Sequence, residues 1–378
     1  MGNTLTNLAP ILFGVAQQVS QEPVGALDGI NLSFDDKGVA VGDDVKIPVA
    51  PAQAATDFTP GAAAASGADQ IADSETVKIT ASKKVTWHLT GEQQRSLANG
   101  GSDKEWLRQL IAQGMRTLKN LAEADALTAI KSGASRAIGA AGTTPFASNI
   151  DDIAAMYKLL RDNGAPMADL SLVIDTSAGF NLRKLGIIQQ AYQAGSEAER
   201  RTGQLLKQFG FSIRESGGVS LHTKGTGASY VTGATGPYVK GVRDVPLVTG
   251  TGTVLAGDVV TFAADTNNKF IVNTGIAAPG TIKLGRPGLR VSVANGNALT
   301  IGNNYTPNVA FERGAVVGAM RPPVMPENPT IKQLPISDGK GMTFLLLEIA
   351  QYGQITWELH AAWGFKVVQG EHVAVLMG

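Results

Sequence analysis

The 378-residue sequence contains no cysteine. Disulfide bonds, thiol nucleophiles and cysteine-ligated zinc or iron–sulfur centres are therefore excluded. Charged residues make up only 17% of the chain, against roughly 25% in ordinary soluble domains. The 32 basic and 32 acidic residues cancel, which disfavours a protein that holds nucleic acid through a strongly basic surface.

Long apolar runs are also missing. The longest candidate, residues 344–347, is followed by Glu348 and is far shorter than the roughly 18 residues of a membrane span. No lysine or arginine precedes Lys37, so the basic region of a signal peptide is absent. We therefore expect a soluble protein with no membrane partner. Hydrophobic residues, at 43%, are abundant enough to form a core.

Patterns typical of catalysis are sparse. The four histidines show no metal-ligand spacing, and no serine lies in a G-x-S-x-G motif. In adjacent carboxylate pairs such as Asp35 and Asp36, the two side chains of a strand would point to opposite faces, so their oxygens would not converge. The glycine-rich stretches match neither a dinucleotide fingerprint nor a P-loop. We expect no enzyme activity, no cofactor and no metal site.

The charge is unevenly distributed although the total is zero. Residues 1–80 hold three lysines, no arginine and ten acids, a net charge of −7. This acidic arm begins with five aliphatic residues spaced three or four apart, which predicts a short amphipathic helix that Pro10 makes less regular. The five residues are Leu5, Leu8, Leu12, Val15 and Val19.

Two strands are predicted next, at 39–49 and 75–89, because apolar and polar residues alternate there. The 51–74 segment between them contains Pro60 and Gly61 and then four alanines, so it has little to pack on itself. A compact domain rarely contains so long a loop unless the loop is functional. We therefore predict a long two-stranded arm that projects from the body.

The central part of the chain has the pattern of an α+β block. A capping box at Ser102 and Glu105 begins a helix that ends at Gly133, about 30 residues or roughly 45 Å later. Three further elements are predicted: a helix from Asp151 to about Gly164, a buried strand at 170–174 and a helix at 177–185.

The composition changes over residues 222–306. This segment has 14 glycines, no Glu, Gln, Met or Trp, and a net charge of +4. Short runs rich in threonine and valine recur between turn signals, which predicts a small β-barrel or sandwich inserted in the central block. Strands are predicted again from Met342 to the end of the chain.

Three segments resemble parts of a known protein family. Residues 257–262 (GDVVTF) resemble a strand of that family's inserted barrel. Residues 307–323 resemble the returning strand of its axial domain, and residues 357–364 (WELHAAWG) resemble the last strands of its peripheral domain. With the order of elements, they make the whole chain similar to the major coat proteins of tailed bacteriophages, specifically the short-tailed phage coat family with an insertion domain. The resemblance implies the α+β capsid fold of tailed phages and herpesviruses (Hong Kong ninety-seven-like, or Johnson fold).

The resemblance also implies a division of the chain into seven parts. These are the N-terminal arm (1–44), extended-loop hairpin (45–89), peripheral domain with spine helix (90–134), axial domain (135–221), inserted β-barrel (222–306), axial return (307–341) and peripheral C-terminal strands (342–378).

The function that the resemblance implies is a structural, self-assembling shell subunit. Hexamers and pentamers would form an icosahedral head that encloses double-stranded DNA without sequence-specific binding, with a scaffolding protein and a portal as partners. The chain would be assembled in the bacterial cytoplasm and reside in the virion. A net charge near zero suits copies packed edge to edge. We predict intersubunit contacts from seven residues: Leu8, Leu12, Val15, Asp57, Phe58, Lys83 and Lys84.

Two other interpretations stay open. An encapsulin-type cargo shell would share the fold, and encapsulated nucleic acid would separate the two. A carbohydrate-binding or carbohydrate-active protein would use the 222–306 module, but would need convergent carboxylates and an aromatic platform. Some members of the resembled family crosslink subunits through Lys–Asn bonds, to which Lys83 or Lys84 could contribute. Because no asparagine follows Asn328, we do not expect this crosslink.

Overall fold

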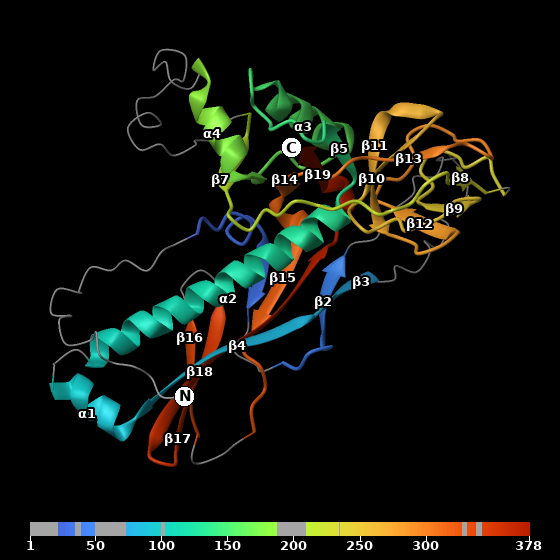
Figure 1. Ribbon diagram of the computed structural model, residues 1–378. Helices are drawn as coiled ribbons and strands as arrows, with labels where there is room; N and C mark the ends of the chain where they lie inside the picture. The colour runs from blue at the N-terminus through green and yellow to red at the C-terminus, as the bar shows by residue number, and fades with distance from the viewer. Residues whose placement is uncertain are drawn as a thin grey trace, which may run out of the picture.

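The computed structural model describes residues 22–34, 39–49, 73–99, 103–186, 209–233, 235–326, 331–337 and 342–378. Figure 1 shows an elongated molecule in which the long helix α2 (Asp103–Gly133) runs beside one sheet and ends near a second. The short helix α1 (Gly91–Asn99) lies at the far end of α2. The strands from β8 to β13 form a separate lobe at the opposite end.

The first sheet has six strands, and its central strand is the 14-residue β18 (Gln354–Val367). β18 pairs with β17 (Thr343–Gln351) and β15 (Val316–Arg321) through successive segments, and with β4 (Ala81–Thr90) over 354–363. The outer strands are β16 (Ile331–Ser337) beside β17 and β1 (Asn31–Phe34), parallel to β15. A β-carbon at Gly133 would collide with Val367, so glycine is needed where α2 approaches β18.

The second sheet has eleven strands and crosses from the central block into the lobe. Nine of them follow one path: β7 (Phe211–Glu215), β6 (Leu170–Ile174), β14 (Pro307–Glu312), β19 (Val373–Met377), β5 (Arg136–Gly139), β11 (Asp265–Thr274), β12 (Gly280–Leu284), β9 (Asp244–Val248) and β8 (Val231–Thr232). β10 (Val259–Phe262) joins β11 to β13 (Leu299–Ile301). The pairing of β11 with β5 makes the lobe continuous with the central block.

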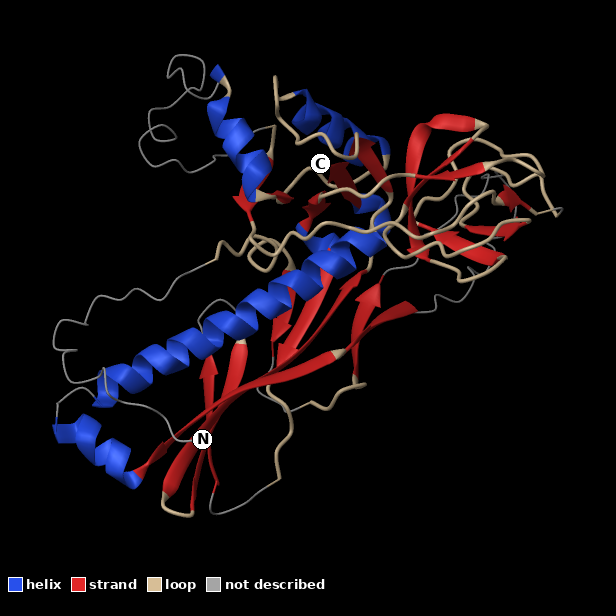
Figure 2. Ribbon diagram, in the orientation of Figure 1, coloured by secondary structure: helices blue, strands red, loops and turns tan. Residues whose placement is uncertain are grey.

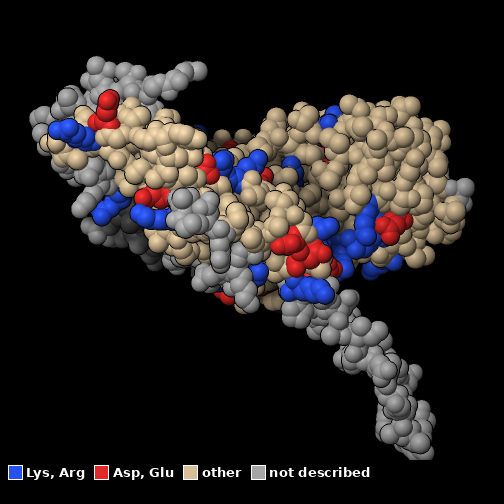
Figure 3. Space-filling model, turned by 90° about the horizontal axis from the view of Figure 1, so that it is seen from below, with Lys and Arg blue, Asp and Glu red and all other residues tan. Residues whose placement is uncertain are grey.

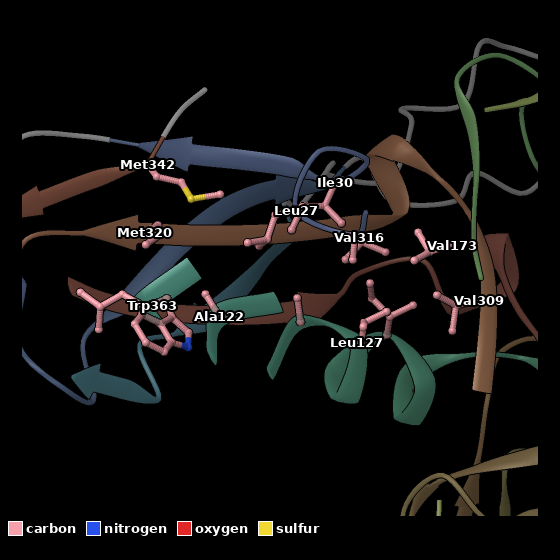
Figure 4. Close-up of a cluster of buried hydrophobic side chains, with 14 of the residues drawn as sticks. Leu27, Ile30, Ala122, Leu127, Val173, Val309, Val316, Met320, Met342 and Trp363 are labelled. Carbon is pink, nitrogen blue, oxygen red and sulfur yellow. The ribbon is translucent and has the colours of Figure 1, made fainter. Parts of the chain in front are cut away.

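Buried side chains form several cores. The largest core lies between α2 and the six-stranded sheet, and Figure 4 shows Leu27, Leu127 and Val316 within it. A second core lies under α3 (Asp151–Asp162) and α4 (Thr176–Lys184). The lobe has a core of its own, which includes Tyr230, Phe270 and Leu299.

Most predicted elements of the central block are confirmed. The long helix is α2, the helix after Asp151 is α3, the strand at 170–174 is β6, and the following helix is α4. Gly164, with a φ of +81°, follows the end of α3. The sequence did not predict α1, whose nine residues are mostly polar.

Two predictions about the strands were wrong in detail. The predicted 75–89 strand is two strands, β3 (Asp73–Lys78) and β4, because the chain leaves one partner and joins β18 between them. The predicted 39–49 strand is regular only over β2 (Asp44–Val49), since a turn lies at residues 41–42.

The division predicted at 341/342 does not coincide with the division between the sheets. β15 and β16 precede that point but belong to the six-stranded sheet, together with β17 and β18. β19 lies after it but returns to the eleven-stranded sheet, between β14 and β5. The chain therefore crosses between the sheets twice after residue 307, since alternation of apolar residues does not reveal which sheet a strand joins.

Candidate functional site

The base of the predicted arm is an antiparallel hairpin of β2 and β3. The two strands pair from Asp44 with Lys78 to Val49 with Asp73, and they form a sheet separate from the two larger ones. Figure 2 shows this pair between the six-stranded sheet and the lobe. The arm is therefore confirmed at its base, and the 51–72 part of the tip lies outside the described residues.

The hairpin base is held against the body by buried side chains and backbone hydrogen bonds. Val77 and Ile79 are fully buried against Val317 and Ala362 of the six-stranded sheet. The N–H of Thr80 donates to the carbonyl of Trp363 at 3.0 Å. These contacts fix the direction in which the hairpin leaves the body.

Charges add to this attachment. Lys366 Nζ donates to Glu75 Oε2 at 2.6 Å and to the carbonyl of Thr76 at 2.9 Å, and Arg286 Nη2 lies 4.0 Å from Glu75 Oε1. The hydrogen bond from Lys366 holds the pKa of Glu75 below its usual value of 4.5. Figure 3 shows that charged side chains occupy small mixed groups on an otherwise uncharged face.

Acid is expected to loosen the hairpin base. Because the pKa of Glu75 is lowered in the folded state, its contribution to stability is present above pH 4.5 and is lost as the pH falls through the folded pKa. Hydrogen exchange of β2 and β3 should therefore accelerate, relative to that of β17, as the pH falls below 4.5. Glu75→Gln should show the faster exchange already at pH 7, whereas Glu348→Gln should not. Equal exchange in wild type and Glu75→Gln at pH 7 would contradict this.

The N-terminal segment is anchored on α2 by one buried carboxylate, Glu123, which is 1% exposed. Its Oε1 accepts hydrogen bonds from the N–H groups of Gly25 (2.8 Å) and Ala26 (2.7 Å) and from Ser216 Oγ (2.7 Å). Its Oε2 accepts from the N–H of Leu27 at 2.9 Å. Residues 25–27 are thus held at a fixed point on α2.

A second buried cluster joins the lobe to the end of α2. His222 Nε2 lies 2.8 Å from Asp258 Oδ1, and Lys131 Nζ lies 3.1 Å from His222 Nδ1. Asp258 also accepts hydrogen bonds from backbone N–H groups, including that of Leu255 at 2.8 Å. Burial lowers the pKa of Lys131 and raises the pKa of Tyr305, which packs on His222. This cluster ties both ends of the 222–306 segment to the body.

Five of the seven predicted contact residues, Leu8, Leu12, Val15, Asp57 and Phe58, lie outside the described residues. Lys83 and Lys84 are consecutive residues of β4, and both are exposed. Lys84 Nζ donates to Glu358 Oε1 at 2.8 Å within the same sheet. Burial raises the pKa of Glu358, but hydrogen bonds from Lys84 and His360 outweigh it and lower that pKa. The intersubunit role of Lys83 and Lys84 stays a prediction.

The surface of the lobe offers no aromatic platform among its described residues. All five aromatic side chains of the 222–306 segment are at most 7% exposed. They are Tyr230, Tyr238, Phe262, Phe270 and Tyr305. These rings build the lobe's core and its junction with α2, so they are not available to stack on a sugar.

Two absences among the described residues bear on other classes of function. No three His, Asp or Glu residues in those ranges lie together as metal ligands. None of the described helices is long and apolar enough to cross a membrane.

Comparison with solved structures shows a phage capsid-protein fold, and the match that carries this is a cyanophage capsid. The capsid of Cyanophage P-SCSP1u matches with a TM-score of 0.50 at 13% identity, over 96% of this chain and 90% of that one. A Mycobacterium phage Che8 structure matches at 0.47, with 15% identity over 89% and 84%. A virus-like particle from Pyrococcus furiosus matches at 0.39, with 10% identity over 97% and 95%. No family model and no curated protein matches the sequence.

Proposed function

We propose that the chain is a structural capsid subunit that assembles with copies of itself into hexamers and pentamers of an icosahedral phage head around double-stranded DNA. The observation that carries this proposal is the β2–β3 hairpin, which pairs with neither large sheet and leaves the body in a direction fixed by Val77, Ile79 and Glu75. A hairpin that belongs to neither large sheet is suited to contact a neighbouring copy.

The parts of the fold take roles in this proposal. The six-stranded sheet with α2 corresponds to the peripheral domain, the β7–β5 part of the second sheet to the axial domain, and the lobe to the insertion. The acidic N-terminal arm leaves from Glu123 and reaches a neighbour through Leu8, Leu12 and Val15, while the hairpin reaches one through Asp57 and Phe58. A scaffolding protein and a portal are the further partners, and the virion is the location.

Assembly of the purified chain tests the proposal. We expect rings or shells of many subunits by light scattering and negative-stain microscopy, formed by the chain alone or with its scaffolding protein. A strict monomer under all conditions would contradict the proposal. Particles that enclose protein cargo and no nucleic acid would instead favour the encapsulin-type shell.

A further inference from the structure

A basic cavity lies where three elements meet at the seam between the lobe and the central block. Its volume is about 210 Å³, and it is lined by β5, α3 and the first part of β11. The polar side chains on its wall are Arg136, Lys158, Asp162, Asn267, Asn268 and Lys269. Since liquid water takes about 30 Å³ per molecule, the cavity can hold a small ion together with several waters.

Arg136 is the buried member of this group. The residue is 9% exposed, and its two terminal nitrogens donate to amide oxygens, those of Asn268 and Asn163, each at 2.8 Å. The Nε atom is buried and has no hydrogen-bond partner in the described structure. No carboxylate of the described residues forms an ion pair with this guanidinium. A buried charge without a counterion is costly, so an anion bound beside Arg136 would be stabilised there.

The two carboxylates nearest Arg136 are engaged by other side chains. Lys158 pairs with Asp162 at 2.7 Å on the surface of α3, and Lys269 Nζ donates to the carbonyl of Gly139. Asp265 lies behind Asn268, whose amide contacts both of its oxygens at 2.9 and 3.0 Å. Burial, and to a smaller extent the nearby Arg290, lower the pKa of Arg136, while Asp162 and Asp265 partly offset this.

We propose that this cavity binds a phosphate group. Its wall carries three cationic side chains and one carboxylate, an excess of two positive charges that is enough to neutralise either a phosphate ion or a phosphodiester. Donors come from Arg136, Lys158 and Lys269 on three different elements, which suits a tetrahedral anion with several acceptor oxygens better than a planar carboxylate. The bound group would connect α3, β5 and β11, and so stiffen the seam. Its source is either free phosphate or the backbone of nucleic acid.

Calorimetric titration of the full, unassembled chain with inorganic phosphate in a chloride buffer tests the site. We expect one site per chain with a Kd of about 1 mM or tighter. Arg136→Gln should weaken binding at least about tenfold, because it removes a charge-assisted donor. Lys158→Gln, at a side chain that is 78% exposed, should preserve the fold and weaken binding about threefold. Lys332→Gln, a matched exposed lysine on β16, should have no effect.

A second titration distinguishes free phosphate from a nucleic-acid backbone as the source of the phosphate group. A short DNA duplex that displaces inorganic phosphate in an Arg136-dependent way would identify a backbone site, and failure to displace it would identify a free-ion site. Absence of phosphate binding, or equal binding by wild type and both cavity variants, would overturn the proposal. Since these titrations use unassembled chains, their outcome is independent of whether the chain forms shells.

Discussion

Replacing Glu123 with alanine is expected to lower the free energy of unfolding by about 3–5 kcal/mol, because it removes the acceptor of four hydrogen bonds at a buried position. Three backbone N–H groups and the hydroxyl of Ser216 would be left without their partner, each at a cost of about 1–3 kcal/mol before water enters. The measurement is urea unfolding followed by circular dichroism.

Two variants make this result specific. Glu123→Gln keeps one acceptor oxygen but places an amide N–H₂ group against N–H donors. The free energy of unfolding should therefore fall by about half as much as in Glu123→Ala. Glu348→Ala removes a carboxylate whose partner Lys332 is exposed, and should cost less than about 1 kcal/mol. A loss for Glu123→Ala no larger than that for Glu348→Ala would contradict the anchoring role.

The Glu123 variants should also affect the arm. Residues 25–27 lose their attachment to α2, so their amides should exchange faster even where the rest of the fold persists. If shells form, Glu123→Gln should reduce their yield more than Glu348→Ala does. An unchanged yield with faster exchange would separate the stability role of Glu123 from assembly.

The main helices could be predicted from the sequence because each has one buried face. α2 and α3 repeat apolar residues every three or four positions, and both end at a glycine or just before one. The strand β6 is buried on both faces, so its five residues form a run of high hydrophobicity. The local sequence is sufficient to predict an element when the burial of that element alone determines which of its residues are apolar.

The anchor at Glu123 could not be predicted in this way. Its partners are backbone N–H groups 96 to 98 residues earlier in the chain, and every non-proline residue carries such a group. The cavity at Arg136 is similar, since the part of its wall on β11 comes from residues more than a hundred positions after β5 and α3. The split of the predicted 75–89 strand also depends on a distant residue, Gly364, where a β-carbon would collide with the carbonyl of Lys78.

The second large effect is expected at Trp363, at the centre of the six-stranded sheet. This side chain is fully buried, and its residue pairs with Met320 on β15 and with Ala81 on β4. Its Nε1 donates to Asp125 Oδ2 on α2 at 2.8 Å, so one residue connects the spine helix to three strands. Figure 4 shows the indole ring directed toward α2 beside Ala122.

Trp363→Ala should therefore lower the free energy of unfolding by about 3–5 kcal/mol, through the cavity and the lost hydrogen bond. Trp363→Phe keeps most of the volume and should cost about 1–2 kcal/mol. Trp106→Ala is the matched control: this tryptophan is only partly buried, at the far end of α2, and its loss should cost about 1–2 kcal/mol. Urea unfolding of the three variants gives the comparison. Equal losses for Trp363→Ala and Trp106→Ala would show that α2 is not held to the sheet mainly at its centre.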